Sequence, residues 1–160
     1  MMIEEEVFSD HNPLVYMRLY ELNPDGFLVA EKDGTIVGFV VGILVSENTG
    51  RVLSLAIANE YRRSGVATQL VNKILKIFAE GGVESVRLEV RKSNTGAQHF
   101  YQGLGFMVNG SAPQYYSDGE DATIMVKVLG KGVDTDGSGR IYSDAAISCR
   151  KRTQHRPAKL

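Results

Sequence analysis

The chain has 160 residues, of which 43% are hydrophobic, and its formal net charge is −1. This size predicts one globular domain with its own core and leaves little room for a second. Because opposite charges are interspersed, neither a specific nucleic acid nor a membrane surface is expected as a partner. The chain starts with an acidic segment and has no apolar run near the roughly 18 residues of a spanning helix, so we expect a cytoplasmic protein. Its single cysteine, Cys149, excludes an internal disulfide and a zinc-type cysteine cluster.

The first half of the chain predicts the start of a sheet. A short helix is expected at about 13–21. Residues 27–32 and 35–45 are rich in β-forming residues and are joined by an Asp-Gly dipeptide suited to a tight turn, which predicts an antiparallel hairpin. A third strand is expected at 51–58.

From Gly65 the apolar residues change to helical spacing. The predicted inward face of this helix consists of Val66, Ala67, Leu70, Val71, Ile74, Leu75 and Phe78. A Gly-Gly pair ends the helix, and a strand follows within 83–90. A second helix should run to about Leu104, and two strands are expected near 106–108 and 122–128. The inward residues of this second helix would be Ala97, Phe100, Tyr101 and Leu104. The order of elements is an α/β arrangement.

The composition changes at about Gly130, where residues rich in Gly, Asp and Ser give way to a basic segment. Few of these residues can join a core, which predicts a domain over 1–129 and a flexible tail over 130–160. Within the tail, 134–141 is similar to the first part of an EF-hand loop, but Ala145 stands where that loop needs a bidentate carboxylate. No metal is therefore expected.

The segment between the third strand and the first long helix has the composition of a phosphate-binding loop. A helix N-terminus leaves backbone amides unpaired and carries partial positive charge, so these amides can surround a pyrophosphate. Gly65 and Ala67 keep the approach open, and two arginines add charge. The candidate ligands are the amides of Arg62, Arg63, Ser64, Gly65, Val66 and Ala67. Short loops with glycine are common, so an ordinary strand-to-helix loop remains the alternative.

This segment resembles the signature of the GCN5-related N-acetyltransferase (GNAT) family, which is Arg or Gln, two residues, Gly, one residue, then Gly or Ala. Further matching segments lie at 53–57, 88–94 and 100–106, and the resemblance covers 27–129. Within the family, the chain is most similar to the archaeal and eukaryotic N-terminal acetyltransferases, especially at 115–122. It is also similar to the bacterial enzyme that acetylates a ribosomal-protein N-terminus.

The resemblance implies a mixed, mostly antiparallel sheet flanked by helices, with a splayed strand pair that forms a slot for acetyl-CoA. It implies that the 62–67 amides bind the pyrophosphate, and that Asn94 and Tyr101 lie against the pantetheine arm. Backbone groups of Leu55, Ala56 and Ile57 would pair with this arm like an added strand. The only cysteine lies outside the recognisable domain, which favours direct attack in a ternary complex over a covalent relay.

Attack of an amine on a thioester requires a neutral amine, a stabilised oxyanion and a proton for the thiolate. Glu89 is the candidate base, at the position that the bacterial relative uses. The alternative is that Glu89 forms an ion pair with Arg87, Arg91 or another cation, because alternation puts Arg87, Glu89 and Arg91 on one strand face. Tyr101 is the candidate acid, and its alternative role is that of a half-buried aromatic beside Phe100.

Four further positions belong to the candidate site, two of them on the catalytic side and two on the substrate side. The related archaeal and eukaryotic enzymes use an acidic residue in the first loop, which aligns loosely with Asp10 and makes it a further catalytic candidate. They also often have a histidine where this chain has Arg51. This departure puts a histidine-based mechanism in doubt. Tyr115 and Tyr116 are predicted to bind the substrate, where a hydroxyl could hold its first peptide bond; alternatively they cover the edge of the core.

The resulting functional hypothesis is acetylation of the α-amino group of protein N-termini, with nascent chains or ribosomal proteins as candidate partners. An α-amino group has a pKa of about 8, against about 10.4 for lysine, so it asks less of a general base. A lysine or small-amine acetyltransferase of the same fold, and a non-catalytic acetyl-CoA binding module, remain open alternatives.

Overall fold

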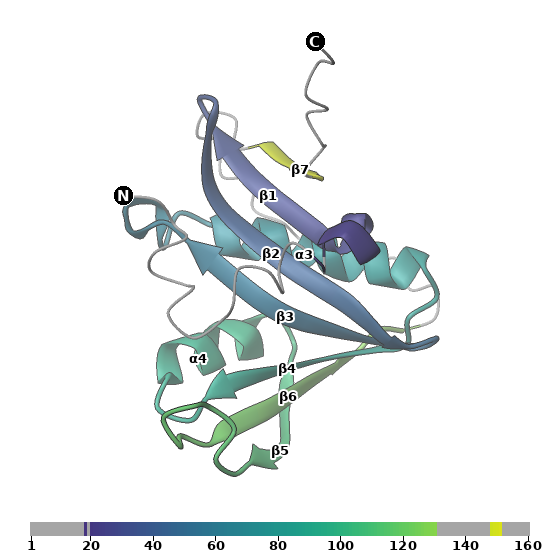
Figure 1. Cartoon of the computed structure of the whole chain (residues 1–160), viewed down its shortest axis with the longest axis vertical. Helices are drawn as coiled ribbons and strands as arrows, with labels where there is room; N and C mark the ends of the chain where they lie inside the picture. The colour runs from purple at the N-terminus through teal and green to yellow at the C-terminus, as the bar shows by residue number, and fades with distance from the viewer. Residues whose placement is uncertain (1–17, 19, 131–147, 152–160) are drawn as a thin grey trace.

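The computed structural model describes residues 18, 20–130 and 148–151 (Figure 1). Its centre is a seven-stranded sheet in the order β5-β6-β4-β3-β2-β1-β7. The strands are β1 (Phe27–Lys32), β2 (Thr35–Ser46), β3 (Thr49–Ile57), β4 (Ser85–Arg91), β5 (Met107–Ala112), β6 (Ala122–Val128) and β7 (Ser148–Lys151). Only the β3–β4 pair among these is parallel, so the expected mixed, mostly antiparallel sheet is confirmed.

The helices flank this sheet. They are the short 3-10 helices η1 (Pro24–Gly26) and η2 (Asn59–Tyr61) and the α-helices α3 (Val66–Glu80) and α4 (Thr95–Gly103), and residues 20–22 are also helical. No helix in the described part of the chain is long and apolar enough to span a bilayer. In Figure 1, α3 lies behind the strands β1 and β2.

The expected hairpin of β1 and β2 is confirmed, with β1 at its predicted bounds. Asp33 and Gly34 both have positive φ, at 50° and 78°, which is the backbone that a tight two-residue hairpin turn requires. The hairpin forms one side of the sheet and leaves β3, its next neighbour, in the middle.

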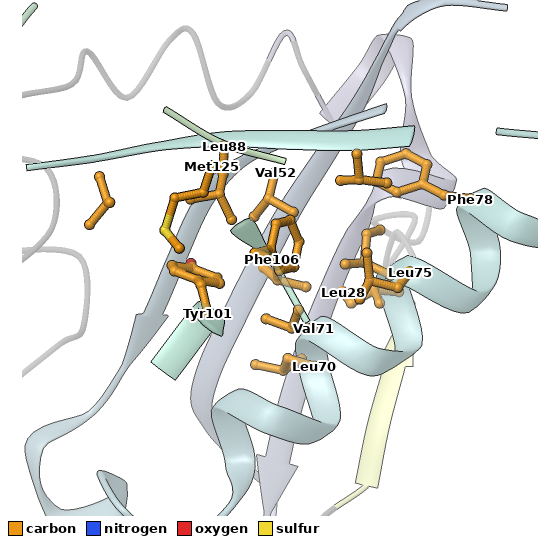
Figure 2. Packing of buried hydrophobic residues seen from close by; sticks show 14 of the residues in the cluster. Leu28, Val52, Leu70, Val71, Leu75, Phe78, Leu88, Tyr101, Phe106 and Met125 are labelled. Carbon is orange, nitrogen blue, oxygen red and sulfur yellow. The ribbon is translucent and has the colours of Figure 1, made fainter. Parts of the chain in front are cut away.

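The main core lies on the face of the sheet that α3 and α4 cover. The α3 residues Val66, Leu70, Val71, Ile74, Leu75 and Phe78 are buried, as the helical spacing predicts, while Ala67 is half-buried. They pack with sheet residues such as Leu28, Val52, Leu88 and Met125, and with Tyr101 and Phe106 (Figure 2). The opposite face carries a smaller core of Phe27, Val29, Phe39, Val41 and Ala56.

Three details differ from the expectations. Phe106 is buried in the main core just before β5, and the exposed strand β5 runs on to Ala112. On α4, Tyr101 is buried, but Ala97, Phe100 and Leu104 only pack on the margin of the core.

The third difference lies in the tail, where residues 148–151 form β7 and pair antiparallel with β1. The EF-hand-like segment 134–141 and most of the expected first helix lie outside the described residues.

The strands β3 and β4 splay apart. Their pairing is confined to Thr49–Ser85, Gly50–Val86 and Arg51–Arg87, although β4 pairs with β6 and β3 pairs with β2 beyond these points. Figure 1 shows the two strands meeting at one end and fanning apart toward the other. A bulge at Leu53, which is skipped in the pairing with β2, marks the point where β3 turns away.

Candidate functional site

The splay exposes a strand edge in the middle of the sheet. From Val52 to Ile57, the side of β3 that faces β4 has no strand partner among the described residues. Unpaired backbone N–H and C=O groups of this kind can bind an extended chain by strand-like hydrogen bonds. The side chains of Leu55 and Ile57 pack on the main core and Ala56 is buried on the other face, so only their backbone groups are directed along the edge.

The loop at the end of β3 leads directly to the N-terminus of α3. It contains η2 and two residues with positive φ, Arg63 at 60° and Gly65 at 84°. The Arg62 Nε donates to the Ile57 carbonyl at 3.2 Å, and the Ser64 hydroxyl donates to the Tyr61 carbonyl. The first contact ties the loop to the end of the exposed strand edge, and the second stabilises the loop itself.

The start of α3 has the form of an anion site. Gly65 is the N-cap and provides no side chain to cap the helix, so the first-turn amides are left to a ligand or to water. A Cβ added to Gly65 would meet no atom within 4 Å, which leaves the approach to these amides clear. With Arg62 and Arg63 exposed beside it, the loop fits a pyrophosphate.

Asn94 begins α4 on the other side of the splay. Its Oδ1 accepts a hydrogen bond from the Ala97 amide at 3.0 Å, which makes it the N-cap of this helix. The side-chain amide group retains its two N–H donors, so a contact with the pantetheine arm stays a prediction.

Tyr101 is enclosed where α4 meets the core. Its ring packs edge-on against Phe100 and Phe106, with ring centroids 5.0 and 5.6 Å away. Burial raises the pKa of the Tyr101 phenol, and the nearby phenol of Tyr116 raises it further. Tyr101 therefore keeps its proton at neutral pH and is available as a donor.

Glu89 lies on the opposite face of β4 from the main core, where Arg51 binds it. The Arg51 Nε is 2.8 Å from the Glu89 Oε2, and the Glu89 side chain is only 7% exposed. The Arg87 Nε lies 3.6 Å from the Oε1, so the expected ion pairing of Glu89 is confirmed, with Arg51 and Arg87 as its partners. Arg91, the other residue named as a partner, contacts Asp118 and Glu120 instead. A terminal nitrogen of Arg51 also donates to the Tyr115 hydroxyl at 2.5 Å.

The loop 113–121 between β5 and β6 carries the two tyrosines. Arg91 holds this loop: its Nη1 lies 2.7 Å from Asp118 and 2.8 Å from Glu120. The same guanidinium lies over the Tyr116 ring, 4.1 Å from its centroid. Tyr116 also packs edge-on against Tyr115, with the ring centroids 5.1 Å apart.

Hydrogen bonds hold the loop carboxylates in their charged form. Bonds from Ser93, followed by Arg91, lower the pKa of Glu120 to about 2. A bond from the Glu120 amide, followed by Arg91, lowers the pKa of Asp118. In contrast, burial raises the pKa of Tyr116 most, and the charge of Glu89 contributes to this rise. Tyr116 thus lies in the electrostatic range of both Glu89 and Tyr101.

The structure brings most of the predicted site residues to the splay. Glu89 lies on one face of β4 and Tyr101 lies in the core on the other face. From the loop 113–121, Tyr115 contacts Arg51, and Tyr116 is close enough to Glu89 and Tyr101 for their pKa values to be linked. Asp10 lies outside the described residues. Arg91 and Glu120, which fix the loop, were not predicted as site residues, although the alternation of β4 had put Arg91 on the face of Glu89.

Comparisons with known proteins agree with this geometry. The family model "Acetyltransferase (GNAT) family" matches residues 2–106. An uncharacterised N-acetyltransferase of Methanocaldococcus jannaschii is 35% identical over 127 residues, which are 78% of this chain and 81% of the relative. An N-alpha-acetyltransferase of Sulfurisphaera tokodaii is 36% identical over 115 residues, 64% of this chain and 69% of the relative. The crystal structure of Ard1 from Thermoplasma volcanium superimposes with a TM-score of 0.74 at 32% identity, covering 79% of this chain and 90% of that one.

Splayed central strands, with a helix N-terminus that has no side-chain cap at the end of the splay, together with the family match, define a GNAT-type acetyltransferase, an enzyme that uses acetyl-CoA. The chain belongs to the GNAT family.

Proposed function

We propose that this protein transfers the acetyl group of acetyl-CoA to the α-amino group of protein N-termini, by direct attack in a ternary complex. The observation that carries the proposal is the link between a carboxylate at the splay and a tyrosine of the overhanging loop: Arg51 binds both Glu89 and Tyr115. The relatives named N-alpha-acetyltransferase and Ard1 support the same activity.

Acetyl-CoA, which supplies the acetyl thioester, would be held by two features of this chain. The amides of 62–67 at the start of α3 would bind its pyrophosphate, with the charges of Arg62 and Arg63 beside them. The backbone edge at Leu55–Ile57 would bind the pantetheine arm, with Asn94 on the opposite side of the splay. The absence of a Cβ at Gly65 keeps the first of these two contacts open.

Glu89 and Tyr101 would move the two protons of the reaction. Arg51 donates to Oε2 of Glu89, whereas Oε1 has only the ion-pair contact with Arg87 at 3.6 Å and receives no hydrogen bond from it. Oε1 would therefore accept the proton from the amine, directly or through a water molecule. Tyr101 would donate a proton to the leaving sulfur from the other face of the sheet. A proton acceptor and a proton donor on opposite faces suit a reaction in which the amine arrives on one side and the thiol leaves on the other.

Tyr115 and Tyr116 would bind the first peptide bonds of the substrate. The loop that carries them is held by charged contacts to Arg91 and by a hydrogen bond from the Ser93 amide to Glu120 at 2.8 Å. A fixed loop presents its hydroxyl groups at a constant position, which favours a substrate whose amine and first peptide bond are a constant distance apart. An N-terminal α-amine meets this requirement, whereas a lysine amine is on a flexible side chain.

Thiol release from acetyl-CoA tests the proposal with pairs of short peptides. One member of each pair begins with a free Ser, Ala or Met, and the other is blocked at its N-terminus and contains an internal lysine. We expect turnover only with the free N-termini. Turnover with the blocked peptides would assign a lysine acetyltransferase, and tight acetyl-CoA binding without turnover on any peptide would favour a small-amine enzyme or a binding module. A free ribosomal-protein N-terminal peptide belongs in the same panel.

A further inference from the structure

Arg51 lies at the end of the splay where β3 and β4 are still paired. It pairs in register with Arg87 in the last β3–β4 pair before the two strands separate. Its backbone is therefore held by strands on both sides, by Ile43 of β2 and by Arg87 of β4. A side chain rooted here has a fixed origin, while the backbone beyond it opens into the slot.

The guanidinium of Arg51 has two partners that lie far apart in the chain. Its Nε donates to Glu89 at 2.8 Å, and a terminal nitrogen donates to the Tyr115 hydroxyl at 2.5 Å. A guanidinium is planar and its donors have fixed directions, so the orientation that satisfies one partner also sets the direction offered to the other. The Arg51 side chain is 20% exposed and that of Glu89 is 7% exposed, so water competes little for the bond between them, whereas the bond to Tyr115 is exposed.

We propose that Arg51 is a positioning residue that couples the peptide-binding loop to the proton-accepting carboxylate. Through the two hydrogen bonds of Arg51, the position of the Tyr115 hydroxyl fixes the orientation of the Glu89 carboxylate. Binding of the peptide by the loop and alignment of the base are therefore linked. The roles of Glu89 and Tyr115 in this inference rest on the proposed function.

The other cation near Glu89 cannot replace this link. The Arg87 side chain is 43% exposed, its Nε is 3.6 Å from Glu89, and this nitrogen is enclosed without a hydrogen bond. The loop itself is anchored separately by Arg91 and Glu120, so loss of Arg51 would leave the loop folded. Arg51 is thus the described residue that contacts both functional groups.

A double-mutant cycle tests the coupling with Arg51→Met, Tyr115→Phe and the double variant. Arg51→Met should lower kcat about tenfold or more, the scale of one hydrogen bond to a charged group, with the Kd for acetyl-CoA unchanged. Tyr115→Phe should raise the peptide KM in both backgrounds but lower kcat only when Arg51 is present. Arg51→Lys, which keeps the charge but has one donor group for two partners, should recover part of kcat. Lys76→Gln removes an exposed cation on α3 and should change neither kcat nor the peptide KM.

Three results would overturn the coupling: an unchanged kcat in Arg51→Met, an equal loss of kcat for Tyr115→Phe in both backgrounds, or full recovery in Arg51→Lys. Thermal unfolding provides a readout without turnover, because linked partners give a double variant whose shift is smaller than the sum of the single shifts. Additive shifts would show that the contact is absent. If the enzyme accepts only lysine or a small amine, the proposed function fails while the same cycle on that amine still decides the role of Arg51. If no amine is acetylated, the unfolding cycle decides it.

Discussion

Arg51 of β3 and Arg87 of β4 form the last register pair before the two strands separate. Glu89, two residues further along β4, is therefore the first residue beyond this pair on the same face of β4 as Arg87. Its carboxylate reaches back to both arginines, at 2.8 and 3.6 Å. The candidate base is thus placed at the closed end of the slot by the pairing of the strands themselves.

Substitution of Gly65 by leucine should abolish acetyl-CoA binding. Gly65 has a φ of 84°, and a larger side chain would enter the open space in front of the α3 amides. The positive φ should also lower the free energy of unfolding by about 1–2 kcal/mol. Calorimetric titration with acetyl-CoA and a thermal melt measure the two effects.

Gly82 is the matched control for this substitution. It has a φ of 83° and equally open surroundings, but it follows the C-terminal end of α3. Gly82→Leu should therefore cost similar stability and leave the affinity for acetyl-CoA unchanged. Undiminished binding in Gly65→Leu would refute the anion site at the start of α3.

Glu89→Gln should lower kcat about 100-fold or more while the Kd for acetyl-CoA stays the same, because the amide cannot accept the proton. Raising the pH should recover part of the lost rate, since more of the α-amine, with a pKa of about 8, is then already neutral. A rate profile from pH 6 to about pH 10 checks this. Native turnover at every pH would remove Glu89 as the base.

Tyr101→Phe should lower kcat about 100-fold with little effect on stability, because the ring that packs on Phe100 and Phe106 is retained. Tyr101→Ala, in contrast, should cost about 3–5 kcal/mol of unfolding free energy through the cavity it leaves. Burial raises the pKa of Tyr101, so its ionisation should produce no fall in rate at or below about pH 10. A Phe variant with native kcat would leave Tyr101 as a core residue only.

Glu120→Gln should loosen the loop 113–121 and raise the peptide KM. Because folding lowers the pKa of Glu120 from 4.5 to about 2, its stabilising contribution is complete above pH 4.5 and is lost as the pH falls toward 2. The stability difference between the native protein and Glu120→Gln should therefore shrink over this range. Urea unfolding at several acidic pH values measures it, and a constant difference would contradict the role of Glu120.

The sequence predicted the local structure well because the signals were local. The Asp-Gly turn follows from a dipeptide, and the buried face of α3 follows from apolar residues spaced three and four apart. The strands β1 and β6 have the predicted bounds. The strand β5 was predicted too short because its polar residues Asn109 to Ser111 give no alternating pattern. In β7 the four residues Ser-Cys-Arg-Lys carry no strong strand signal, so its pairing with β1 could not be foreseen.

The site depended on contacts that no local pattern encodes. The segments 51–58 and 83–90 read as ordinary strands, and nothing in them shows that their pairing ends at Arg51 and Arg87. The bond between Arg51 and Tyr115 joins residues 64 positions apart. The motif resemblance supplied the slot and Glu89, whereas Arg51 could be recognised only as a departure from the relatives.

The most direct test of the account uses one peptide that has both a free α-amine and an internal lysine. After limited turnover with acetyl-CoA, tandem mass spectrometry of the product shows which nitrogen carries the acetyl group. The account predicts that the α-nitrogen is acetylated and the lysine is not, and that Glu89→Gln loses this product. Acetylation of the lysine with a free N-terminus remaining would contradict the proposed function.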